Sequence, residues 1–87
     1  MAKPGTYRPV FSEGAADFLV RLPKRRQREI IAVARKLAEH PFVRSDYRIP
    51  DEGGREIEHL MIEDYVFAYW LDHATKEVRI ADIEDAT

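Results

Sequence analysis

The chain has 87 residues, of which 45% are hydrophobic and 34% charged, with no cysteine and a formal net charge of −2. A chain of this length encloses one hydrophobic core, so residues 1–87 are expected to form a single domain of about two layers. No apolar run approaches the roughly 20 residues that cross a bilayer, and the lack of cysteine excludes disulfides, thiolate catalysis and Cys-type zinc sites.

Charge is unevenly distributed along the chain. Residues 1–48 carry eleven lysines and arginines against five aspartates and glutamates, whereas residues 49–87 carry three against eleven. The net charge is therefore +6 for residues 1–48 and −8 for residues 49–87. A basic half can contact nucleic acid or an acidic protein, and it can equally be an ordinary solvated surface. The first residues lack the apolar core of a signal peptide, which predicts a cytoplasmic protein.

The first half of the chain predicts a strand and two helices. Residues 1–6 are expected to be a frayed terminus and residues 7–11 a short edge strand. Ser12 is suited to cap a short helix that ends before Pro23, and residues 24–40 follow the period of a second helix. The apolar side chains expected to face the core from these helices are Phe18, Leu19, Ile30, Ile31 and Leu37.

The second half predicts three strands around the stretch Tyr65–Leu71. Its seven residues include no charge and no helix breaker, which indicates a central strand buried on both faces. We expect Phe67, Tyr69 and Trp70 to be core residues there, and not a platform for stacking bases. A tight turn at Glu63-Asp64 joins this stretch to a preceding strand.

The remaining segments complete an α+β fold. Residues 55–62 and 77–83 are the strands on either side of the central one, and residues 41–54 are a connecting loop with a short extended piece at residues 47–49. The expected architecture is an N-terminal strand, a two-helix hairpin and a three-stranded antiparallel meander. Together they would form a four-stranded, largely antiparallel sheet with the helices on one face.

Several short motifs occur in a fixed order along the chain. They are Phe11-Ser12 with Ala15, Ala16 and Leu19; Leu22-Pro23; Ile30, Leu37-Ala38 and His40-Pro41; Asp64-Tyr65 and Tyr69; and Val78 with Ile80. Their order and spacing resemble the RelE/ParE superfamily of type II toxin–antitoxin modules over nearly the whole length. The resemblance implies a small toxin that cuts messenger RNA in the ribosomal A site or poisons DNA gyrase. It also implies an antitoxin partner, and it is compatible with a homodimer.

The chain differs from this family at the positions where its ribonucleases carry basic side chains. Such enzymes commonly carry an arginine where this chain has Val66, alternating basic residues where it has His59 and Met61, and a basic pair near Asp85-Ala86. These departures favour a toxin that is not an enzyme and acts by binding a target such as gyrase.

A ribonuclease is the alternative. Cleaving RNA through its 2′-hydroxyl needs a base, an acid and cations for the charge that develops on the phosphate. His59 with Arg55 and a carboxylate such as Asp82 or Glu84 could supply them, although a histidine on a partly polar strand is more often a solvated side chain. A non-toxic member kept for partner binding is a third alternative.

A basic cluster marks the start of the second helix. Lys24, Arg25, Arg26 and Arg28 place four positive charges within five residues at the helix end that is less favourable for cations. The cluster predicts a contact with ribosomal RNA, DNA or an acidic antitoxin segment, and a solvated face is the plain alternative. The histidines lack the spacing of metal ligands, and Gly53-Gly54 is no phosphate loop, so neither metal nor cofactor is expected.

Overall fold

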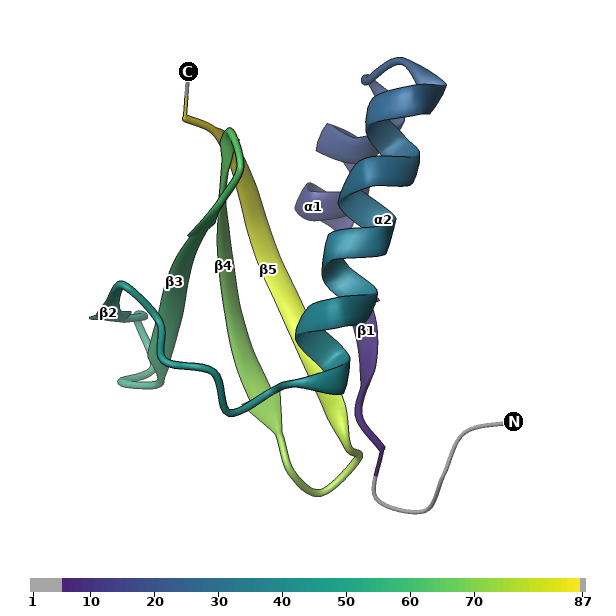
Figure 1. The fold of residues 1–87 in the computed structure, drawn as a ribbon. Coiled ribbons are helices and arrows are strands. Elements are labelled where there is room, and N and C mark those ends of the chain that lie inside the picture. Colours follow the sequence, from purple (N-terminus) through teal and green to yellow (C-terminus); the bar gives the residue numbers. More distant parts are fainter. Residues whose placement is uncertain (1–5, 87) are drawn as a thin grey trace.

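The computed structural model describes residues 6–86, so the frayed terminus expected at residues 1–6 lies outside the described part except for Thr6. Two helices and five strands follow one another in the predicted α+β order (Figure 1). In chain order they are β1 (Arg8–Phe11), α1 (Glu13–Val20), α2 (Lys24–Glu39), β2 (Tyr47–Pro50), β3 (Glu56–Ile62), β4 (Tyr65–Asp72) and β5 (Glu77–Asp85). No helix within residues 6–86 is long and apolar enough to cross a membrane.

The five strands form one mixed sheet in the order β1-β5-β4-β3-β2. The meander of β3, β4 and β5 is antiparallel as predicted, and β1 pairs with β5 in parallel. The expectation of four strands is wrong, because β2 pairs with β3 from Tyr47 opposite His59 to Pro50 opposite Glu56. The short extended piece expected at residues 47–49 within the connecting loop is therefore a paired strand, the outermost one of the sheet.

Polar contacts hold β2 in place. The backbone N–H of Asp46 donates to the His59 carbonyl at 2.8 Å, and the Asp46 carboxylate accepts the Met61 N–H at 2.6 Å. Glu58 accepts hydrogen bonds from Ser45 at 2.6 Å and from Arg48 at 2.9 Å. All four residues of β2 are exposed, so Tyr47 and Ile49 alternate along the strand without a buried face to hold it on the sheet.

The helix boundaries follow from local chemistry. Ser12 caps α1, accepting the Ala15 N–H at 3.1 Å, and its hydroxyl donates to the Ala81 carbonyl at 2.7 Å, which ties the helix start to β5. Pro23 precedes the first residue of α2 and provides no side-chain cap. Gln27 donates to the Leu22 carbonyl at 2.8 Å, so the connection between the helices is held from within α2.

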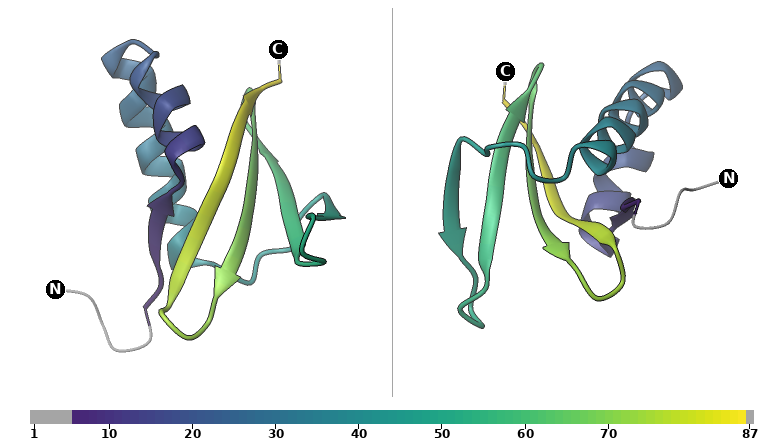
Figure 2. Two further views of the ribbon diagram at one scale, coloured as in Figure 1. Left: turned by 180° about the vertical axis from the view of Figure 1, so that it is seen from behind. Right: turned by 60° about the horizontal axis from the view of Figure 1, so that its bottom comes forward.

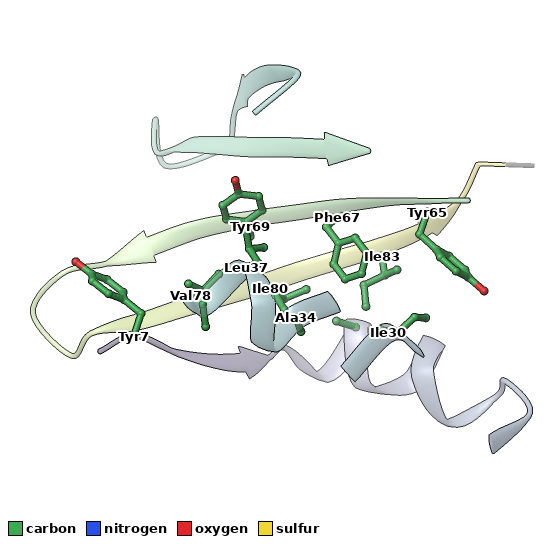
Figure 3. Packing of buried hydrophobic residues seen from close by; sticks show 12 residues of the cluster. Tyr7, Ile30, Ala34, Leu37, Tyr65, Phe67, Tyr69, Val78, Ile80 and Ile83 are labelled. Atoms are coloured by element: carbon green, nitrogen blue, oxygen red, sulfur yellow. The ribbon is translucent and has the colours of Figure 1, made fainter. Parts of the chain in front are cut away.

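A single cluster of buried apolar residues joins the two layers (Figure 3). The expected core positions Ile30, Leu37, Phe67 and Tyr69 are confirmed as buried. Phe18 and Leu19 are partly buried and pack against this cluster. Ile31 is only half-buried, because the inward stripe of α2 runs through Ile30, Ala34, Leu37 and Ala38, and Ile31 lies about 100° round the helix from Ile30.

Within the described residues 6–86, only one face of the sheet is covered by helices. Both helices lie on the same side of it (Figure 2), where α1 contacts β5 and α2 contacts β1 and β5. Along β4, Tyr65, Phe67 and Tyr69 face the helices, so Val66 and Trp70 face the other way. The prediction of a central strand buried on both faces is therefore wrong. We call the uncovered side of the sheet the open face.

Replacing Phe67 with alanine tests the single core. Phe67 is fully buried, so Phe67→Ala should lower the free energy of unfolding by about 3–5 kcal/mol. Met61→Ala is the matched control, because Met61 is 57% exposed and its loss should change stability by only about 0.5 kcal/mol. Urea unfolding followed by circular dichroism measures both variants. Equal effects of the two substitutions would contradict the described core.

Candidate functional site

The register of the sheet brings the predicted catalytic residues to the open face. His59 on β3 and Asp82 on β5 both pair with Ala68 on β4, so all three side chains point to one side. Because neighbouring strands lie about 4.8 Å apart, the backbones at His59 and Asp82 are roughly 10 Å apart. Arg55 lies one residue before β3, at the same face. The three residues thus share a surface without forming a hydrogen bond to one another within the described structure.

His59 is held in one orientation. Its ring stacks on that of Tyr47 with centroids 4.7 Å apart and planes 11° from parallel. Nδ1 of His59 lies 3.1 Å from the Ile57 carbonyl oxygen, which can only accept a hydrogen bond. Nδ1 therefore carries the proton in the neutral ring, and Nε2 is the nitrogen left free to take one.

A bulge places Asp82 on the open face. Tyr69 pairs with Ile80 and Ala68 with Asp82, so Ala81 is an extra residue in β5. Without it, Asp82 would share the inward face of Ile80, because alternate strand residues point the same way. The bulge turns Asp82 outward and returns Ile83 to the core. Nothing in the sequence pattern marked this shift.

The centre of the open face is a tryptophan between two arginines, and the sequence analysis missed it. Trp70 is half-buried, with the Arg55 Cζ atom 3.8 Å and the Arg79 Cζ atom 5.6 Å from the ring centroid. These distances are those of cation–π contacts. The expectation that Trp70 is a core residue is wrong, since β4 is covered on one side alone. The sequence analysis did not pair Trp70 with Arg79, a pairing that the register of the β4–β5 hairpin creates.

Arg79, the second arginine beside Trp70, forms ion pairs with carboxylates. Arg79 contacts Asp72 at 3.2 Å and Glu77 at 2.9 Å, and Arg8 contacts Glu77 at 3.0 Å. The hydrogen bond from Thr75 keeps the pKa of Glu77 below its usual value against the opposing effect of burial, and the hydrogen bond from Arg8 and the charges of Arg79 and Arg8 lower it further. Burial raises the pKa of Asp72, but hydrogen bonds from Thr75 and Arg79 outweigh it and the net shift is downward.

The basic cluster lies away from the open face. Lys24, Arg25 and Arg28 are exposed on α2, and Arg26 is half-buried with its Cζ atom 5.3 Å from the centroid of the Tyr65 ring. Within residues 6–86 none of the four forms an ion pair. The structure therefore brings Arg55, His59 and Asp82 together on one surface and the basic cluster to another.

An apolar groove lies between α2 and β3, where the helices leave the sheet uncovered on its inner side. Its volume is about 350 Å³, and the chain lines it with Val33, Lys36, Leu37, His40, Val43, Leu60, Ile62 and Glu63. Val43 is 46% exposed at this groove. Among residues 6–86, no three histidine or acidic side chains come close enough to hold a metal ion.

Comparison with known proteins identifies the fold. No protein-family model and no curated protein matches the sequence. A chain of the archaeal RelE–RelB complex from Pyrococcus horikoshii OT3 matches with a TM-score of 0.70 and 20% identity, over 93% of this chain and 96% of that one. A chain of the RelBE2 toxin–antitoxin complex from Mycobacterium tuberculosis matches with a TM-score of 0.73 and 20% identity, over 92% and 98%. The predicted RelE/ParE-like fold is thereby confirmed.

Acid titration tests the carboxylate contacts of the open face. Because the folded-state pKa of Glu77 is lowered from 4.5, its charge contributes stability above about pH 4.5 that is lost as the pH falls through the folded value. Glu77→Gln cannot titrate, so its urea midpoint should fall less than that of the wild type between about pH 7 and about pH 3. Glu52→Gln in the exposed β2–β3 loop is the control. Parallel pH profiles of Glu77→Gln and the wild type would refute the contribution.

Proposed function

We propose that the chain is the toxin of a type II toxin–antitoxin pair and that it cleaves messenger RNA on the ribosome through the open face of its sheet. Support comes from the RelE fold, since both matched chains come from complexes that include an antitoxin. The proposal of an enzyme rests on one observation: His59, Asp82 and Arg55 lie on the same uncovered surface. The expected cytoplasmic location agrees with a ribosomal target and is part of this proposal.

The open face supplies groups for each step of RNA cleavage. Nε2 of His59 removes the proton of a 2′-hydroxyl, and the 2′-oxygen attacks the adjacent phosphorus. The bond from phosphorus to the 5′-oxygen breaks, and that oxygen takes a proton from a water molecule, whose other hydrogen the exposed Asp82 carboxylate accepts in a hydrogen bond. The products are a 2′,3′-cyclic phosphate and a 5′-hydroxyl. The roughly 10 Å between the strands of His59 and Asp82 leaves space for a ribose phosphate, and Arg55 at the head of β3 adds positive charge for the neighbouring RNA backbone.

Target binding without cleavage is the second candidate. Val66 stands where the ribonucleases of this family commonly have an arginine, and it pairs with Glu84. Asp82 and Glu84 are exposed, so they disfavour the approach of RNA phosphates. A toxin that docks on a protein such as gyrase, or a non-toxic member kept for partner binding, would accommodate these acids. The ribosome assay separates this candidate from the first.

Cleavage of messenger RNA on programmed ribosomes tests the enzymatic proposal. The wild-type protein should cut in the A site, and His59→Ala should slow the cut roughly 10²-fold or more, because the base is lost. His40→Ala is the control, since His40 lies at the end of α2 and lines the groove on the other side of the sheet. Growth inhibition by a wild-type protein that leaves ribosomal messages uncut would contradict the proposal and favour target binding.

We propose that an amphipathic antitoxin segment fills the groove between α2 and β3. Its apolar residues would cover Val33, Val43 and Leu60, and its acidic residues would meet Lys36 and His40 at the rim. The basic cluster of Lys24, Arg25, Arg26 and Arg28 offers a second contact for an acidic antitoxin segment or for ribosomal RNA. A short disordered chain can bury much area on a small protein in this way.

A charge placed in the groove tests the antitoxin surface. Val43→Asp should weaken binding of the antitoxin encoded beside this gene by about tenfold or more, because a carboxylate would be buried against apolar groups. Val20→Asp is the matched control, since Val20 is 67% exposed on α1 and does not line the groove. Co-purification and titration calorimetry measure both. Equal affinities of the two variants would rule out the groove as the antitoxin site.

A further inference from the structure

Arg55 and Trp70 form a stacked pair on the open face. The Arg55 Cζ atom lies 3.8 Å from the centroid of the Trp70 ring, which is contact distance. Stacking occupies the flat side of a guanidinium group and leaves the N–H donors along its edge available. Such donors match the oxygens of a phosphate, and two of them can bind it at once. The tryptophan thus holds a cation in place without neutralising it.

The loop between β2 and β3 fixes the backbone of Arg55. The Asp51 carboxylate accepts the N–H groups of Gly53 at 2.9 Å and of Arg55 at 2.8 Å. The Asp51 N–H donates to the Arg55 carbonyl at 2.8 Å, and Gly54 adopts a φ of +83° that few other residues tolerate. The guanidinium group therefore starts from a defined position at the head of β3.

Arg55 differs from the other arginines at this surface. Arg79 and Arg8 contact carboxylates at 3.2 Å or less. The ion pair of Arg55 with Asp51 is longer, at 3.9 Å, and the Arg55 side chain is 52% exposed. Within residues 6–86, Arg55 is the one of the three whose guanidinium group forms no hydrogen bond to a carboxylate, so its donors can bind a phosphate.

The position of the pair suits a chain that crosses the proposed site. Trp70 and Ala68 are two residues apart on β4, which is about 7 Å along the strand. Ala68 lies between His59 and Asp82 in the sheet register. A phosphate bound at Arg55 is therefore on the scale of one nucleotide from a phosphate held between those two residues.

We infer that Arg55 and Trp70 form a phosphate-binding unit for single-stranded RNA, in which Arg55 contacts the phosphate and Trp70 is the positioning residue that orients it. The choice of RNA as ligand rests on the proposed function. The unit itself rests on the stacking distance, the loop geometry and the free donors.

The tryptophan makes the inference directly measurable, because the chain has one Trp and its fluorescence reports from this surface alone. Titrating the full chain with a short oligouridylate at low salt should change that fluorescence to saturation. Arg55→Ala should weaken binding on the order of tenfold and reduce the salt dependence by about one phosphate contact. Arg35→Ala, which removes an exposed arginine from α2, is the matched control and should bind as the wild type does.

Substitutions at Trp70 separate positioning from charge. With fluorescently labelled RNA as the probe, Trp70→Leu should weaken binding about as much as Arg55→Ala, and Trp70→Phe should restore most of it, since phenylalanine keeps a ring for the guanidinium. The urea midpoint of each variant shows whether the fold persists. If Trp70→Leu unfolds the protein, the RNA affinities of Arg55→Ala and Arg35→Ala decide whether the unit binds RNA: equal affinities would contradict it.

The outcomes distinguish this inference from the proposed function. The protein could bind RNA through Arg55 and Trp70 and yet leave ribosomal messages uncut. That result would contradict the ribonuclease proposal and support the phosphate-binding unit. Cleavage by a protein in which Arg55→Ala and Trp70→Leu bind RNA like the wild type would overturn the unit. A wild-type protein that binds no oligouridylate would overturn it as well.

Discussion

The packing of α2 against the sheet is the interaction on which the rest of the structure depends. Each large apolar side chain buried there contributes about 1.5–3 kcal/mol, and together they order both layers. The main contacts come from Ile30, Ala34 and Leu37 of α2 and from Phe67, Ile80 and Ile83 of the sheet. Both helices contribute to this interface, so within residues 6–86 the opposite face of the sheet has no covering layer (Figure 2).

Charged side chains, and not a second layer of helices, cover the apolar groups of the open face. Ion pairs of Arg8 and Arg79 with Glu77 and Asp72 cover one end of it, and guanidinium groups lie over Trp70 where a helix would lie on the inner face. The same polarity provides groups that can act on RNA. The chemistry proposed for the protein thus depends on the half-covered architecture, which leaves these polar groups accessible.

Much of the fold could be predicted because its signals are local. The apolar stripe of α2, the cap at Ser12 and the uncharged run of β4 all mark their elements within a few residues. For strand β2 the sequence indicated only a short extended piece at residues 47–49, and its pairing with β3 could not be predicted because polar contacts define it. The sequence analysis named His59, Arg55 and Asp82 as candidates. It could not show that the bulge at Ala81 turns Asp82 to the open face, or that the register brings Arg55 to Trp70.

The central claim is that the open face is the working surface of this protein. Nuclear magnetic resonance of the labelled protein, titrated with single-stranded RNA, tests it most directly, because the indole N–H of Trp70 and the ring of His59 report from that face. The account predicts that these two signals shift most and that backbone signals of β3 to β5 follow them. Shifts confined to Lys24, Arg25 and Arg28 on α2 would contradict it and would assign RNA contact to the helical side.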